Sequence, residues 1–127
     1  MVPETPPLGE SPPGAFSVLR KRADFLHAAR AQRAPMPAFL LQARLRDPAE
    51  PAETAVRVGF TCSKKVGNAV ARNRAKRRLR EIARAVIPTE GQAGWDYVLI
   101  GRADATADHP FEAMKADLAR ALRKLHK

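Results

Sequence analysis

The stretch VRVGFTCSKKVGNAVARNRAKRRLREIAR, residues 56–84, is the most informative part of the chain for both fold and function. In its first part, apolar residues alternate with small or polar ones, which is typical of a β-strand with one buried face. After two lysines and a Gly-Asn turn, a helix is predicted from Ala69 to Ile87, ended by Pro88. Seven of the thirteen residues from Arg72 to Arg84 are basic, whereas an apolar stripe follows the opposite side. Such a helix is expected to dock on a core and to present its charge to an anion.

The whole-chain composition agrees with an anionic partner. The 127 residues are enough for one domain with a modest core, and their net charge of +10 favours nucleic acid over an acidic membrane surface. A single cysteine, Cys62, excludes an internal disulfide and a thiolate zinc cluster. No apolar run approaches the length of a membrane span, and no secretory signal is recognisable, so a cytoplasmic protein is expected.

The elements around this stretch predict a single α+β domain. Residues 1–15 are rich in proline and are expected to form a disordered tail before one domain over residues 16–127. Helical patterns follow at residues 22–30 and from Pro110, and prolines 35 and 37 leave room for at most a short edge strand. A strand over residues 38–46 is expected to pair antiparallel with the one that begins at Val56, and Trp95–Gly101 suits a central strand. The order predicts an α+β sandwich with helices on one side of the sheet.

The basic helix has two interpretations from its residues alone. It could be an ordinary solvated face, but its arginines outnumber the nearby acids and adjoin Lys64 and Lys65, which favours phosphate binding. RNA or irregular nucleic acid is favoured over sequence-specific duplex DNA, because no helix-turn-helix pair, zinc ligand set or heptad repeat is evident. The polar face of the strand at residues 57–63 could hold an extended single strand, with Phe25 either stacking on a base or packing in the core.

The sequence shows no catalytic or metal site of its own. The three histidines are scattered without metal-ligand spacing, and the aspartates form no pair of the kind that two-metal nucleases use. Cys62 is interpreted as a small core residue. On residues alone, the chain is predicted to be a basic RNA-binding domain.

Several segments resemble the protein subunit of bacterial ribonuclease P. The signature is SKKVGNAVARNRAKRRLRE, in which an Arg-Asn-Arg triplet opens the basic helix. The resemblance covers roughly residues 19–125 and includes RADF at Arg22–Phe25, FLL at Phe39–Leu41, VRVGFTCSKK at Val56–Lys65 and WDYVLIGR at Trp95–Arg102.

The resemblance implies a fold and a function. The fold is a two-layer αβββαβα sandwich, ribosomal protein S5 domain 2-like, with a left-handed βαβ crossover through the basic helix, against the usual right-handed rule. The function is that of a protein subunit that binds the catalytic ribonuclease P RNA and the single-stranded 5′ leader of precursor tRNA. The RNA would then carry the catalytic centre and hydrolyse the phosphodiester at the tRNA 5′ end with Mg²⁺, with no obligate protein partner and no membrane involved.

The resemblance also implies two sets of site residues. One set would face the catalytic RNA: Lys64, Lys65, Arg72, Asn73, Arg74, Lys76 and Arg77. The other would line or border a cleft for the leader: Phe25, Gln42, Arg57, Thr61, Ser63 and Arg80. No residue is expected to be catalytic or to ligate a metal.

Departures from the family pattern leave alternatives open. Ala29 and Gln42 stand where aromatic side chains can occur, so stacking on the leader is expected to be weaker and electrostatic attraction more important. The alternative functions are a ribosomal or general RNA-binding protein without a part in cleavage, and a self-sufficient nuclease, which would need a carboxylate cluster.

Overall fold

The computed structural model describes residues 16–46, 56–62, 64–92 and 94–126. The predicted tail at residues 1–15 and the connection over residues 47–54 lie outside the described residues. In chain order the elements are β1 (Phe16–Val18), α1 (Arg22–Ala29), β2 (Gln32–Pro35), β3 (Phe39–Leu45), β4 (Val56–Cys62), the 3₁₀ turn η1 (Lys64–Val66), α2 (Ala69–Glu90), β5 (Trp95–Gly101), α3 (Ala105–Asp108) and α4 (Phe111–Leu125).

The five strands form one mixed sheet in the order β1-β4-β5-β3-β2. The central strand, β5, runs parallel to β4 and antiparallel to β3. The predicted antiparallel pair of β3 and β4 is therefore wrong, because β5 lies between them. Tyr97, Val98 and Leu99 in β5 are each at most 1% exposed. This burial agrees with the apolar sequence of the strand, which is typical of a strand that is covered on both faces.

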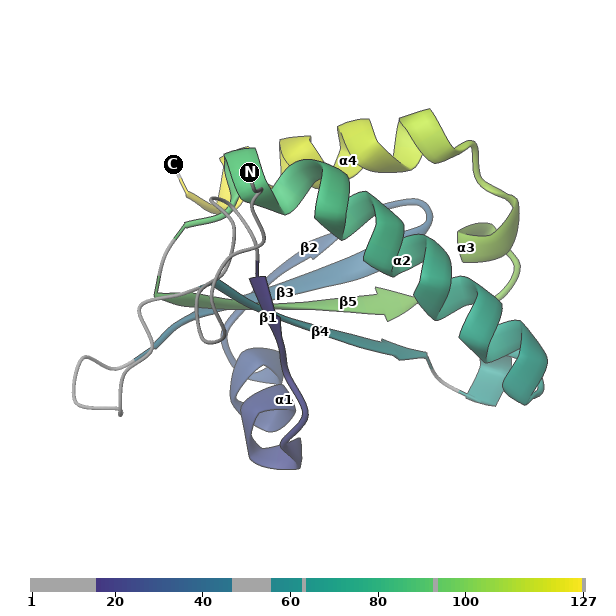
Figure 1. The fold of residues 1–127 in the computed structure, drawn as a ribbon, viewed down its shortest axis with the longest axis horizontal. Helices are drawn as coiled ribbons and strands as arrows, with labels where there is room; N and C mark the ends of the chain where they lie inside the picture. Colours follow the sequence, from purple (N-terminus) through teal and green to yellow (C-terminus); the bar gives the residue numbers. More distant parts are fainter. Residues whose placement is uncertain (1–15, 47–55, 63, 93, 127) are drawn as a thin grey trace, which may run out of the picture.

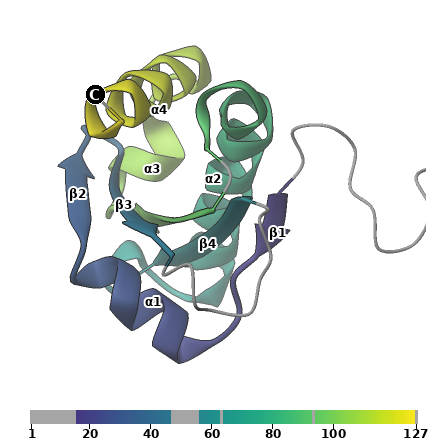
Figure 2. The same ribbon diagram turned by 90° about the vertical axis from the view of Figure 1, so that its left-hand side faces the viewer.

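Helices cover both faces of the sheet. Helices α2 and α4 lie side by side over one face, and α1 lies on the opposite face (Figures 1 and 2). The α+β sandwich is confirmed, but the prediction that all helices share one side is wrong for α1. The main core lies between the sheet and the α2–α4 layer and includes Phe39, Leu79 and Leu122. A smaller core of Leu19, Ala28 and Val98 lies beneath α1.

Helix α2 connects the parallel neighbours β4 and β5, as the predicted βαβ crossover requires. The hand of that crossover stays a prediction. The helix runs to Glu90 and contains Pro88, so the prediction that it ends before this proline is wrong. A proline in the last turn removes only one intrahelical hydrogen bond, and the turn closes with the Gly91 N–H donating to the Ile87 carbonyl at 2.8 Å.

An aromatic cluster joins the end of α4 to the start of β5. The Tyr97 hydroxyl accepts a hydrogen bond from the Gln92 N–H at 3.0 Å and bonds to His126 Nε2 at 2.6 Å. The His126 ring also meets Trp95 edge-on, with ring centroids 4.5 Å apart. Burial raises the pKa of Tyr97 to about 12 and lowers the pKa of His126. Both side chains are therefore neutral in the folded protein at neutral pH.

Because of this cluster, we expect the protein to lose stability in mild acid. Because the pKa of His126 is lower in the folded than in the unfolded chain, its stabilising contribution is present above about pH 6.5 and is lost as the pH falls through the folded pKa. Between about pH 7.5 and pH 5, we expect the free energy of unfolding to fall less in His126→Gln than in the wild-type protein. Urea denaturation of both proteins across this range measures the difference; parallel curves would contradict it.

Candidate nucleic-acid interface

The basic helix α2 begins at a capped turn. Gly67 has a φ of +135°, which favours glycine, and the Asn68 side chain accepts a hydrogen bond from the Ala71 N–H at 2.9 Å. Along one side, Ala75, Leu79 and Ile82 are fully buried against the sheet and α4. The capped turn therefore determines where the helix begins, and the buried apolar side chains determine which side of it faces the core. The arginines on the other side face outward.

The outward side of α2 forms a groove, which we call the basic groove. It has a volume of about 440 Å³ and is lined by Val70, Asn73, Arg74, Arg77 and Arg80. Three of the residues predicted to face the catalytic RNA, Asn73, Arg74 and Arg77, are exposed here together. No acidic side chain is among the described residues that line this groove, so these residues can attract phosphate groups without neutralising one another. Val70 was not predicted as a site residue; it is 67% exposed and adds an apolar side chain to the lining of the groove.

Arg72 and Lys76 lie on the flank of α2 near the end of β4. Both side chains are half-buried, and the Arg72 carbonyl accepts a hydrogen bond from Cys62 Sγ at 3.9 Å. Burial raises the pKa of the Cys62 thiol, although the Gly101 backbone and the charges of Lys76 and Arg72 lower it in part. The thiol is therefore protonated at neutral pH, in agreement with a structural role.

One arginine of α2 is turned inward. Arg78 donates to the His109 carbonyl and to Met114 Sδ, and its guanidinium lies 5.8 Å from the centre of the Phe111 ring. It therefore attaches the start of α4 to α2, and it is not part of the outward basic face.

The predicted lysines precede α2. Lys64 and Lys65 lie in η1, where Lys65 is exposed; the Lys64 side chain lies outside the described part of the structure. Ser63 lies outside the described residues altogether.

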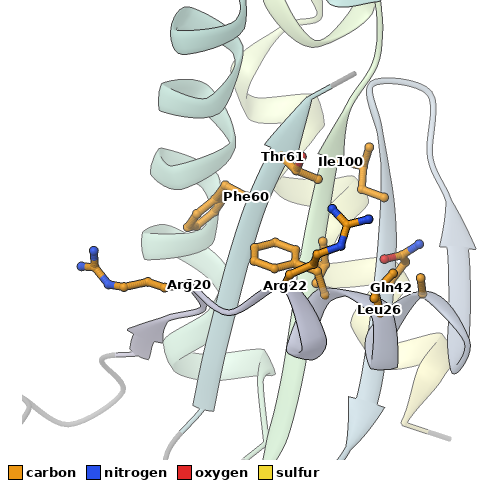
Figure 3. Close-up of a pocket in the computed structure, with 10 residues that line it drawn as sticks. Arg20, Arg22, Leu26, Gln42, Phe60, Thr61 and Ile100 are labelled. Atoms are coloured by element: carbon orange, nitrogen blue, oxygen red, sulfur yellow. The ribbon is translucent and has the colours of Figure 1, made fainter. Parts of the chain in front are cut away.

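A second concave surface, which we call the cleft, lies between α1 and the sheet (Figure 3). It has a volume of about 460 Å³ and brings together three of the residues predicted for the leader: Phe25 from α1, Gln42 from β3 and Thr61 from β4. Arg20 and Arg22 were not predicted, although a basic pair directly before an apolar helical face is a recognisable signal. The other lining residues are Leu26, Ala29, Phe60, Val98 and Ile100.

Gly59 allows α1 to approach the sheet closely at the cleft. A Cβ atom at this position would lie 2.6 Å from Phe25 Cε1 and 3.2 Å from Leu19 Cβ. Any larger residue would displace the Phe25 ring, so the missing side chain of Gly59 positions an aromatic side chain of the cleft.

We expect Gly59→Ala to lower the free energy of unfolding by about 1–3 kcal/mol because the added methyl group overpacks the Phe25 ring. Urea denaturation measures this loss. In the double variant Gly59→Ala/Phe25→Leu the clash is relieved, and the combined loss should be smaller than the sum of the single losses. Strictly additive losses would show that the two side chains do not compete for space.

Arg57, also predicted for the leader, does not line the cleft. Its Nε donates to Asp96 Oδ1 at 2.8 Å, and its Nη2 donates to Oδ2 at 2.7 Å. Asp96 is fully buried and also binds Arg46 Nη1 at 2.6 Å, with Arg44 Nη1 at 3.5 Å. We call these four residues the Asp96 cluster. Arg44 and Arg57 lie directly across from Asp96 on the neighbouring strands, so the sheet register brings the charges together.

Arg80 borders the cleft from the α2 side. Its guanidinium lies 5.5 Å from the centre of the Phe60 ring, and Phe60 itself lines the cleft. Because Arg80 also lines the basic groove, the two predicted surfaces meet at this pair.

Other kinds of site find little support in the described residues. Within the described ranges, no group of three or more His, Cys, Asp or Glu side chains could hold a metal ion. In the same part of the chain, no helix is both long and apolar enough to cross a membrane.

Comparisons with known proteins agree on one family. Residues 15–126 match the family model described as Ribonuclease P. The ribonuclease P protein component of Ruegeria pomeroyi is 65% identical over 111 residues, covering 87% of each chain. That of Gluconacetobacter diazotrophicus is 52% identical over 107 residues, covering 84% of this chain and 88% of the relative.

Solved structures give the same result. The Staphylococcus aureus RNase P protein aligns with a TM-score of 0.67 at 25% identity, covering 87% of this chain and 96% of that one. The Thermotoga maritima RNase P protein aligns with a TM-score of 0.66 at 26% identity, covering 85% and 96% of the two chains.

Proposed function

The chain belongs to the ribonuclease P protein family, and from this premise we propose that it binds ribonuclease P RNA through α2 and the 5′ leader of precursor tRNA through the cleft. The single observation that carries the proposal is the meeting, at Phe60 and Arg80, of two arginine-bearing surfaces whose described lining residues include no acid. One surface is an open basic groove, suited to the backbone of a folded RNA. The other is largely apolar with two arginines at its rim, suited to an extended single strand.

In this proposal the residues divide by chemistry. Arg74 and Arg77 would pair with phosphates of the RNA subunit, with Asn73 as a hydrogen-bonding partner and Arg72, Lys76, Lys64 and Lys65 adding positive potential. In the cleft, Phe25 would stack on a leader base, while Gln42 and Thr61 offer hydrogen bonds. Ser63 stays a prediction, and Arg57 would act indirectly, by holding β4 and β5 in register.

The catalytic centre is proposed to lie on the RNA subunit. The described residues that line both surfaces are basic, amide, hydroxyl or apolar, and none of them supplies the carboxylate oxygen that Mg²⁺ prefers. These residues do not fit a magnesium site, so the Mg²⁺ of the reaction is assigned to the RNA. The protein would reduce phosphate repulsion between two RNAs, so its effect should be largest at low ionic strength and low Mg²⁺. A cytoplasmic location follows as part of the same proposal.

The test is cleavage of a precursor tRNA by a bacterial ribonuclease P RNA at low Mg²⁺, with and without this protein, and with the protein alone. We expect cleavage at the mature 5′ end only when both components are present. Cleavage by the protein alone would overturn the assignment of catalysis to RNA. If the RNA is active at high Mg²⁺ but the protein gives no stimulation at low Mg²⁺, the chain is a general RNA-binding relative instead.

A further inference from the structure

A third concave surface, which we call the edge groove, lies between β1 and the second half of α2. It has a volume of about 330 Å³ and is lined by Phe16, Val18, Arg80, Arg84 and Pro88. We propose that the edge groove binds the 5′-distal nucleotides of the precursor leader after that strand has left the cleft. This inference rests on the proposed function, in which the cleft holds the leader.

The chemistry of the edge groove suits single-stranded RNA. The ring of Phe16, which lines the groove, lies 6.2 Å from the ring of Phe60, and the Arg80 guanidinium lies 5.5 Å from the centre of the Phe60 ring. Arg84 and Val18 are exposed, and no acidic residue is among the lining residues in the described part of the chain. An aromatic ring beside two guanidinium groups offers a stacking surface for a base and a partner for its phosphate. A purely apolar peptide would leave both arginines without an anion, so charge complementarity favours RNA.

A path connects the cleft to the edge groove. The pairing of β1 with β4 ends at Val58, whose carbonyl accepts a hydrogen bond from the Leu19 N–H at 2.9 Å, so β1 does not pair with β4 at Phe60. Phe60 lines the cleft, and Arg80, which contacts its ring, lines both the basic groove and the edge groove. Figure 3 shows Phe60 between α2 and the cleft, with Arg20 extending toward the same side. A strand leaving the cleft can therefore pass over Phe60 and reach Arg84.

The experiment varies leader length. Two precursors share one tRNA body and carry leaders of about 5 and about 15 nucleotides. Only the longer leader is then long enough to extend beyond the cleft and reach the edge groove. Dissociation constants are measured for holoenzyme assembled with wild-type protein, Arg84→Gln and Lys124→Gln. The last is the matched control, since Lys124 is an exposed cation on α4 that lines none of the three surfaces.

We expect Arg84→Gln to weaken binding of the long-leader precursor about 3–10-fold and to leave the short-leader precursor unchanged. For long-leader binding, the slope of the logarithm of the binding constant against the logarithm of salt concentration should become shallower by about 0.7, because one phosphate contact is lost. Phe16→Leu keeps an apolar side chain at the groove and should also weaken only long-leader binding. Lys124→Gln should behave as wild type with both precursors.

Three results would overturn the inference. An equal effect of Arg84→Gln on both precursors would show that the edge groove does not bind the nucleotides that only the longer leader has. Weaker binding of the variant to the RNA subunit alone would assign the groove to that RNA, and a change in the oligomeric state of free Phe16→Leu would assign it to a second copy of the chain. Failure of the proposed function looks different: wild-type protein would then give no gain in affinity even for the short leader.

Discussion

Asp96→Ala is expected to lower the free energy of unfolding by about 3–5 kcal/mol, the largest effect of any single substitution considered for this chain. The reason is the Asp96 cluster, in which one fully buried carboxylate receives hydrogen bonds from Arg46 and Arg57 and an ion pair from Arg44. Removing the carboxylate takes away the anion that these three neighbouring guanidinium groups share, so their mutual repulsion is compensated less well. Urea denaturation with an unchanged m-value measures the loss.

The matched control for this prediction is Asp24→Ala. Asp24 also meets Arg57, but at 3.6 Å and at a more exposed position, so its removal should cost less than about 1 kcal/mol. Asp96→Asn keeps the shape and removes the charge, and it should remain strongly destabilising if charge is the main factor. A loss below about 1 kcal/mol for Asp96→Ala would show that water or backbone groups solvate the arginines well enough without it.

The double variant Arg74→Glu/Arg77→Glu is expected to weaken binding to ribonuclease P RNA by about 100-fold or more while the protein stays folded. Both side chains are exposed in the basic groove and make no hydrogen bond or ion pair that holds the described fold together. Reversal removes two phosphate partners and adds repulsion, so the salt dependence of binding should also decrease. A filter-binding titration at several salt concentrations measures both, with circular dichroism as the test of folding.

The control for charge alone is Arg123→Glu/Lys124→Glu, which changes the net charge equally on α4. It removes the Arg123–Glu90 ion pair and sets two carboxylates opposite each other, and both effects are small at this exposed position. We expect this control to bind RNA within a few-fold of wild type. Similar losses in both double variants would mean that the overall charge, and not the basic groove, attracts the RNA.

Much of the fold could be predicted because its signals are local. The apolar stripe of α2 and the alternation in β4 each depend on residues a few positions apart, and both elements lie where the patterns indicate. The short elements β1 and α3 were not predicted, because three or four residues are too few to show a period. The pairing of β3 with β5 was missed for another reason: strand neighbours in space need not be neighbours in sequence.

The candidate site shows the same division. The outward position of Arg74 and Arg77 follows from helical geometry, and the structure brings them together with Asn73 in one groove. The internal use of Arg78 and Arg57 could not be predicted, because their partners are distant in sequence and an arginine in a basic stretch gives no sign of which way it turns. The closeness of Gly59 to Phe25 is likewise visible only once α1 lies on the sheet.

The central place of β5 has a consequence for synthesis of the chain. Phe60 and Leu41 both lie opposite Leu99, so the strands on each side of β5 cannot be joined until β5 itself has left the ribosome. Until then the nascent polypeptide exposes the unpaired edges of β3 and β4 beside a helix dense in positive charge. Pairing between strands that are distant in sequence slows folding. Before β5 is available, the unpaired strands and the basic helix are therefore open to aggregation and to unintended contact with RNA.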